Sequence, residues 1–130
     1  MSRATIPVDQ RLIVALDVPS GAEARELVDT LGDSVGFYKV GLELFTGTDG
    51  FVTVDWLSDI GKQVFVDIIF FDVPATVASE VNKLRFRNIT FATVHGNDAI
   101  MRAAAEASDD VGILAVTVLT SLDSADMRDL

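Results

Sequence analysis

Residues 64–77 read VFVDIIFFDVPATV, an apolar run that is interrupted by Asp67 and Asp72 and leads into a proline. The run is rich in β-branched and aromatic residues, which is typical of a strand covered on both faces. Pro74 stands where the first turn of a helix tolerates a residue without a backbone N–H. The stretch therefore predicts a strand followed at once by a helix, with two carboxylates where the strand ends.

The same unit recurs along the chain. Five short, nearly continuous apolar runs share this character: RLIVALDV (11–18), GFYKVGLE (36–43), QVFVDIIF (63–70), ITFATVHG (89–96) and GILAVTVLTS (112–121). Helix signals lie between them: Ser20 and Glu23 have capping-box spacing, Gly32 follows at the expected helix end, and Asn97 or Asp98 opens another helix. The pattern predicts a parallel (βα)₄β arrangement, after which SADMRDL (124–130) begins one more helix.

Alternating strands and helices allow a doubly wound sheet or a (β/α)₈ TIM barrel. No GxGxxG or GxxxxGK[ST] follows the first strand, which favours the barrel. A barrel usually needs about 250 residues, whereas this chain has 130. We therefore predict an α/β fold that is half of a TIM barrel, with a rearranged, flavodoxin-like open sheet as the alternative. The expected organisation is an N-terminal tail over residues 1–10 and one half-barrel domain over residues 11–130, truncated at the start of its fifth helix.

Composition and charge exclude several classes of function. The net charge of −10 would repel phosphate backbones, so no nucleic-acid partner is expected. The chain has no cysteine, which excludes disulfides and thiolate metal sites, and with one histidine, His95, no metal site is expected. No apolar run is long enough to span a membrane and no signal peptide is evident. A cytoplasmic protein without a membrane partner is the expectation.

Polar residues mark the ends of the predicted strands. They are Asp17, Lys39, Asp67, His95 and Thr120. Ligands bind at the C-terminal ends of the strands in both candidate architectures. An unpaired lysine buried in an apolar strand is costly, which favours a site role for Lys39.

Together these stretches resemble the orotidine 5′-phosphate decarboxylase family, bacterial type. The resemblance runs from about Arg11 to Leu130 and rests on ALDVPS, FYKVGLELF, VDxxxxDVPATV, TVHG and AVTVLTS. It implies a TIM barrel, a homodimer and no metal or cofactor. The implied activity is that of a carbon–carbon lyase of pyrimidine biosynthesis, which converts orotidine monophosphate (OMP) into UMP and carbon dioxide.

The resemblance also implies roles for matching residues. Among the catalytic positions, Lys39 would contact the substrate and neighbouring carboxylates, and Asp67 would lie against the substrate carboxylate. Asp72 would reach across the dimer interface into the partner's site.

Substrate-binding roles follow in the same way. Asp17 would meet the ribose hydroxyls, and Lys39 would bind substrate as well as act in catalysis. Thr76 would reach across the dimer interface, and Thr120, on the fifth strand, would lie near the pyrimidine ring.

One position departs from the family. Its third-strand motif, Asp-x-Lys-x-x-Asp, carries the lysine that protonates the carbanion, and Ile69 occupies that place, with Phe71 at the place of a frequent histidine. Strand alternation puts Phe65, Asp67, Ile69 and Phe71 on one inward face. General acid catalysis contributes about 10²–10⁴-fold and each electrostatic donor about 10²–10³-fold. Because isoleucine supplies neither, we expect an inactive chain.

Two hypotheses remain open. The first is an inactive N-terminal half that buries its apolar inner face and open strand edges by forming a homo-oligomer, in the simplest case a dimer. It would bind OMP- or UMP-like nucleotides weakly, and its exchange of catalytic polarity for packing suggests an engineered or recombined origin. The second is a half that complements a separate C-terminal half into an active decarboxylase, or a weak related activity of Lys39 on a phosphorylated sugar or pyrimidine.

Overall fold

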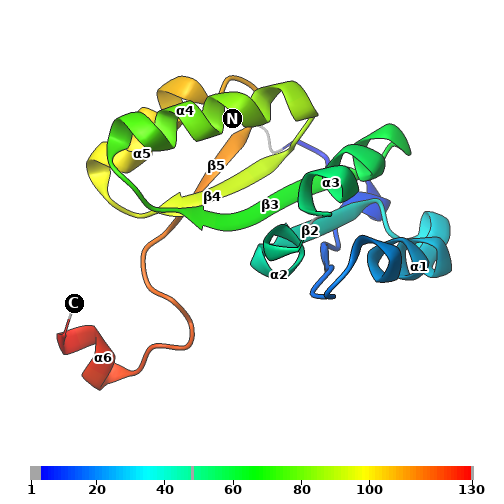
Figure 1. Cartoon of the computed structure of the whole chain (residues 1–130), viewed down its shortest axis with the longest axis horizontal. Helices are drawn as coiled ribbons and strands as arrows, with labels where there is room; N and C mark the ends of the chain where they lie inside the picture. The colour runs from blue at the N-terminus through cyan, green and yellow to red at the C-terminus, as the bar shows by residue number, and fades with distance from the viewer. Residues whose placement is uncertain (1–3, 48, 130) are drawn as a thin grey trace.

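All five predicted strands form, and they pair in parallel in the order of the sequence (Figure 1). The computed structural model describes residues 4–47 and 49–129. The strands are β1 (Val14–Ala15), β2 (Phe37–Gly41), β3 (Gln63–Phe70), β4 (Phe91–His95) and β5 (Gly112–Val116). A flavodoxin-like sheet changes direction at a switch point in its strand order. The order β1-β2-β3-β4-β5 has no such point, so the flavodoxin-like alternative is wrong.

The two outer strands are shorter than their apolar runs. The run over residues 11–18 forms only the two paired residues of β1, and the run over residues 112–121 ends as a strand at Val116. Each of these strands has a neighbour on one side only, so fewer hydrogen bonds hold its ends.

Helices follow the strands and begin and end mostly where the sequence predicts. They are α1 (Gly21–Leu31), α2 (Leu42–Thr46), α3 (Gly50–Asp59), α4 (Pro74–Leu84), α5 (Asp98–Ala107) and α6 (Ser124–Arg128), with short 3-10 turns η1 (Val8–Gln10), η2 (Gly32–Ser34) and η3 (Arg85–Arg87). The Ser20 hydroxyl accepts the Glu23 N–H, and Asn97 caps α5 in the same way. Among the described residues, no helix has the length and apolarity to cross a membrane.

One face of the sheet carries the helices and the core. Fully buried residues of alternate strand positions, Tyr38 and Val40 on β2 and Val64 and Val66 on β3, pack against the apolar stripes of the helices. A smaller cluster joins α4 and α5 over Val94 of β4. Figure 1 shows these two helices side by side. The periodicity of two along each strand therefore decides which side chains enter the core.

The opposite, inner face is only partly covered. Near the N-terminal ends of the strands, Phe91 stacks on Phe37 with ring centroids 5.8 Å apart and meets Phe65 edge-on at 6.2 Å. Leu114 on β5 is 41% exposed. Large apolar side chains thus remain on a face that no helix covers.

The two ends of the described chain differ in their contacts. Part of the predicted tail lies against the sheet, because the Gly36 N–H donates to the Asp9 carbonyl at 2.8 Å. The boundary between tail and domain stays a prediction, and residues 1–3 and 130 fall outside the described residues. At the other end, α6 stands away from the sheet beyond an exposed segment (Figure 1). Asp123 caps α6, and the backbone N–H groups of Asp126 and Ala125 lower its pKa.

Tyr38 generates the first prediction. Its side chain is fully buried, and its hydroxyl has no hydrogen-bond partner among the described residues. An unsatisfied buried polar group costs about 1–3 kcal/mol. Burial also raises the pKa of Tyr38. Folding therefore favours the neutral phenol. The free energy of unfolding falls as the pH rises above the ordinary tyrosine pKa of about 10.

We predict that Tyr38→Phe raises the free energy of unfolding by about 1 kcal/mol at pH 7, and that this advantage grows above about pH 10. Urea unfolding at both pH values measures it. Tyr38→Leu is the matched control and should destabilise through the volume it removes. A loss of stability in Tyr38→Phe at pH 7 would show that the hydroxyl has a partner, such as a buried water.

Candidate functional site

Lys39 and Asp67 form an ion pair on the inner face, near the C-terminal ends of β2 and β3. The Lys39 Nζ lies 3.4 Å from Asp67 Oδ2, and each side chain is about a quarter exposed, 26% and 25%. The β2–β3 register explains the pairing: Lys39 lies opposite Phe65 and Gly41 opposite Asp67, so both charges project from the same face. Two residues that the sequence predicts for the site are therefore brought together.

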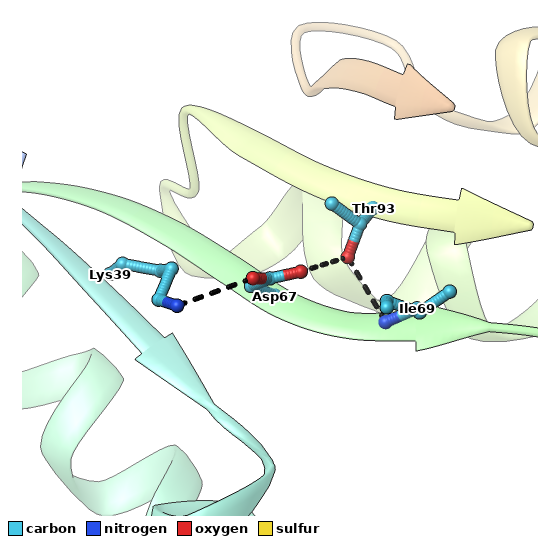
Figure 2. Close-up of polar contacts among 4 residues, drawn as sticks. All are labelled: Lys39, Asp67, Ile69 and Thr93. Atoms are coloured by element: carbon cyan, nitrogen blue, oxygen red, sulfur yellow. Dashed lines mark hydrogen bonds and ion pairs between the residues drawn. The ribbon is translucent and has the colours of Figure 1, made fainter. Parts of the chain in front are cut away.

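Thr93, on β4, completes the group on the other side of Asp67. Its hydroxyl donates to Asp67 Oδ1 at 2.8 Å and accepts the Ile69 N–H at 3.0 Å (Figure 2). Sequence reasoning missed this residue. The available signal was its place two residues before His95 in an apolar run, because that spacing puts both side chains on one face of a strand.

The backbone at Ile69 is irregular. Its φ is 50°, in the left-handed region, where a β-branched residue is a genuine outlier. The β3–β4 register shifts across the same segment: Val66 pairs with Ala92, but Phe70 pairs with Val94. Regular pairing with β4 is therefore interrupted at a bulge around residue 69, while the alternation of faces continues: Ile68 and Phe70 pack on the core, and Ile69 and Phe71 lie on the other face.

Ile69 and Phe71 line one hollow of about 630 Å³. The other lining residues are His95, Val116, Thr117, Leu119 and Leu122. The Phe71 ring, 71% exposed, stacks on the His95 ring with centroids 4.2 Å apart. Positions 69 and 71, two and four residues beyond Asp67 along the chain, thus contribute apolar side chains to the same hollow.

Of the remaining predicted residues, Asp17 lies near this group. A Cβ atom added to Gly41 would lie 3.8 Å from Asp17 Oδ1 and 3.6 Å from the Asp67 carbonyl oxygen. These are ordinary van der Waals distances, so Gly41 lies close to both aspartates, and Asp17 itself is exposed.

Asp72 and Thr76 are exposed on the surface between β3 and the first turn of α4. Asp72 Oδ1 accepts the adjacent Val73 N–H at 2.7 Å, while the N-cap position of α4 belongs to Val73. Neither residue forms a hydrogen bond or ion pair with Lys39 or Asp67, so a role in the site would require contact with another chain.

Thr120 does not lie on a strand. β5 ends at Val116, and Thr120 belongs to the exposed segment between β5 and α6. The expected position at the end of the fifth strand is wrong. An edge strand has a partner on one side only, so nothing extends the ladder to residue 120.

The arrangement limits what chemistry is available. The Lys39 ammonium and the Asp67 carboxylate offset each other, and the Thr93 hydroxyl orients the carboxylate. Residue 69 offers no proton donor. Within residues 4–47 and 49–129, no group of three or more His, Cys, Asp or Glu side chains is placed to hold a metal ion.

Comparison with known proteins identifies close relatives. The model of the "Orotidine 5′-phosphate decarboxylase / HUMPS family" matches residues 10–130. The orotidine 5′-phosphate decarboxylase of Methylococcus capsulatus is 61% identical over 130 residues, covering 100% of this chain and 54% of the relative. That of Stenotrophomonas maltophilia is 49% identical over 134 residues, covering 100% and 56%. The chain thus spans about half the length of the curated relatives it matches.

The fold agrees with solved structures. The crystal structure of orotidine 5′-phosphate decarboxylase from Lactobacillus acidophilus superposes with a TM-score of 0.84 at 32% identity, over 93% of this chain and 58% of that one. Five parallel strands in sequential order therefore correspond to part of a TIM barrel, as predicted.

Ile69 generates the second prediction. A non-glycine residue in the left-handed region costs of order 1–3 kcal/mol, and glycine adopts this region freely. We predict that Ile69→Gly changes the free energy of unfolding by less than about 1 kcal/mol, because strain relief offsets the lost contacts. Ile68→Gly is the matched control, since Ile68 packs on the core without a positive φ, and it should cost about 2–4 kcal/mol. Urea unfolding of both variants measures the difference, and equal losses would contradict the strain.

Proposed function

The chain belongs to the orotidine 5′-phosphate decarboxylase / HUMPS family, and on that premise we propose that it is an N-terminal half of the decarboxylase fold that no longer decarboxylates. The proposal rests on the side chain of Ile69. Decarboxylation leaves a carbanion on the pyrimidine ring, which must be stabilised and protonated. The side chain at position 69 does neither, and Phe71 extends the apolar wall beside it.

Lys39 does not replace the missing donor in this proposal. Its ammonium lies 3.4 Å from Asp67, which draws the charge toward a carboxylate of the protein. Losing general acid catalysis lowers a rate by about 10²–10⁴-fold. Losing one electrostatic donor lowers it by about a further 10²–10³-fold. Activity on OMP is then negligible, and the apolar exchange at positions 69 and 71 supports an engineered or recombined origin.

Weak binding of an OMP- or UMP-like nucleotide is the remaining ligand function. In this proposal Asp17 contacts the ribose and Lys39 contacts the substrate. Asp72 and Thr76, which are exposed, would reach into the site of a partner chain. TIM barrels commonly hold phosphate with loops after their seventh and eighth strands, whereas this sheet has five strands. Because the five strands described here do not include those loops, we expect low affinity from these 130 residues by themselves.

Self-association would cover the inner face. Leu114 and the β5 edge are exposed there, and a homodimer in the cytoplasm, without nucleic-acid, membrane or cofactor partners, is the proposed state. The net charge of −10 opposes it, so screening by salt should favour the dimer.

A second candidate function is complementation. The chain covers 54% of the Methylococcus relative, and its sheet has two open edges at which further strands could pair. A separately supplied C-terminal half would then complete a barrel, and the activity of the complex would again depend on residue 69. A weak activity of Lys39 on phosphorylated sugars or pyrimidines belongs to the same alternative.

The oligomeric state generates the third prediction. Light scattering after size exclusion should give twice the mass of the 14.0 kDa chain, more completely at 0.5 M salt than at about 0.05 M. Leu114→Glu should shift the protein to monomer. Phe86→Glu is the control, because Phe86 is 74% exposed on η3, away from the inner face. A monomer in all conditions, or equal effects of both variants, would contradict the proposed interface.

The fourth prediction concerns decarboxylase activity on OMP. We expect no loss of OMP absorbance above background from the chain alone or after addition of the C-terminal half of the Methylococcus relative. Ile69→Lys with that half should restore turnover by at least about 10²-fold over the unsubstituted complex. Ile68→Lys is the matched control and should restore none.

Turnover by the unsubstituted chain would contradict the proposed inactivity. Turnover only in the unsubstituted complex would favour complementation with a different proton donor. A folded Ile69→Lys complex without activity would show that the site has diverged beyond residue 69.

A further inference from the structure

We infer that Thr93 is a positioning residue, whose hydroxyl fixes the Asp67 carboxylate and the backbone turn at residue 69 together. The role of Thr93 in the site rests on the proposed function. The turn that it holds can be measured without substrate.

The Thr93 hydroxyl both donates and accepts a hydrogen bond. A threonine hydroxyl has one proton to donate and lone pairs to accept with. Its proton points to Asp67 Oδ1 at 2.8 Å, and its oxygen receives the Ile69 N–H at 3.0 Å (Figure 2). Thr93 is 3% exposed, so little water competes for these bonds. The hydroxyl therefore has one orientation that satisfies both neighbours.

The second step concerns the backbone of β3. Isoleucine is a poor residue for a φ of 50°, so its own preference does not produce the turn. The register shift between Val66 and Phe70 removes residue 69 from the regular ladder with β4. The side chain of Thr93 accepts the N–H that the ladder leaves out. Strained conformations persist where the surroundings over-determine them, and here the surroundings include this bond.

The third step joins the two contacts. Asp67 is held between the Lys39 ammonium and the Thr93 hydroxyl, while the same hydroxyl sets the direction of residue 69, two positions along. Any side chain at position 69 is then aimed into the hollow by Thr93. A lysine introduced there would inherit that direction.

Amide exchange and chemical shifts of the full chain, measured by NMR, test the inference. Thr93→Val keeps the shape and removes the hydroxyl, and Thr93→Ser keeps the hydroxyl. The control is Thr90→Val, which removes the hydroxyl bond to Gln63 at the opposite end of the same two strands. Exchange at Val66, in the regular part of β3, reports overall stability.

In Thr93→Val we expect the Ile69 N–H to exchange about three- to tenfold faster, beyond any change at Val66, as the loss of one hydrogen bond implies. The Asp67 ¹³Cγ shift should move as well. Thr93→Ser should keep both signals near those of the unsubstituted chain, and Thr90→Val should leave both unchanged.

The inference is overturned if Ile69 protection and the Asp67 shift survive in a folded Thr93→Val, or if Thr90→Val changes them equally. If Thr93→Val does not fold, Thr93→Ser decides: retained signals support the hydroxyl, and their loss shows that the methyl group holds the turn. An absent decarboxylase activity in Ile69→Lys would count against the proposed function and not against these signals.

Discussion

The arrangement of the site depends on one carboxylate held from two sides. Asp67 lies between the Lys39 ammonium on β2 and the Thr93 hydroxyl on β4, and the parallel register of the three strands brings these residues to one face. The core-forming helices α1, α3, α4 and α5 pack on the other face, so the charged group lies where the sheet is only partly covered. A quarter of each charged side chain stays exposed, which spares the pair the full cost of burial.

The side chains at positions 69 and 71 contrast with this polar group. Ile69 and Phe71 are apolar, and both line one hollow with His95. The remaining polar contacts do not depend on those side chains, because Thr93 binds the backbone of residue 69 and not its side chain. The polar contacts around Asp67 are therefore compatible with different side chains at position 69, which makes a substitution at that position informative.

Much of the fold was predictable, because hydrophobic runs, caps and glycines act locally. Ser20, Asn97 and Pro74 begin helices where the sequence indicates, and Asn88 ends the α4–η3 segment in the left-handed conformation, at φ 55°. The family and the Lys39–Asp67 pairing also followed from motifs. The bulge at Ile69 was not predictable, since it depends on the register against β4 and on a side chain 24 positions away. The predicted position of Thr120 was wrong for a related reason. An edge strand ends where its pairing ends, and β5 pairs with β4 only as far as Val116, although the apolar run continues.

In the proposed function, the site keeps its polar contacts around Asp67 and lacks a proton donor at position 69. Release of labelled carbon dioxide from carboxyl-labelled orotidine 5′-phosphate, by the purified and unsubstituted chain at high protein concentration, tests it most directly. We expect carbon dioxide to be released no faster than in buffer alone. Repeated turnovers per chain, abolished by Asp67→Asn, would contradict it, since they would show that this site catalyses decarboxylation with isoleucine at position 69.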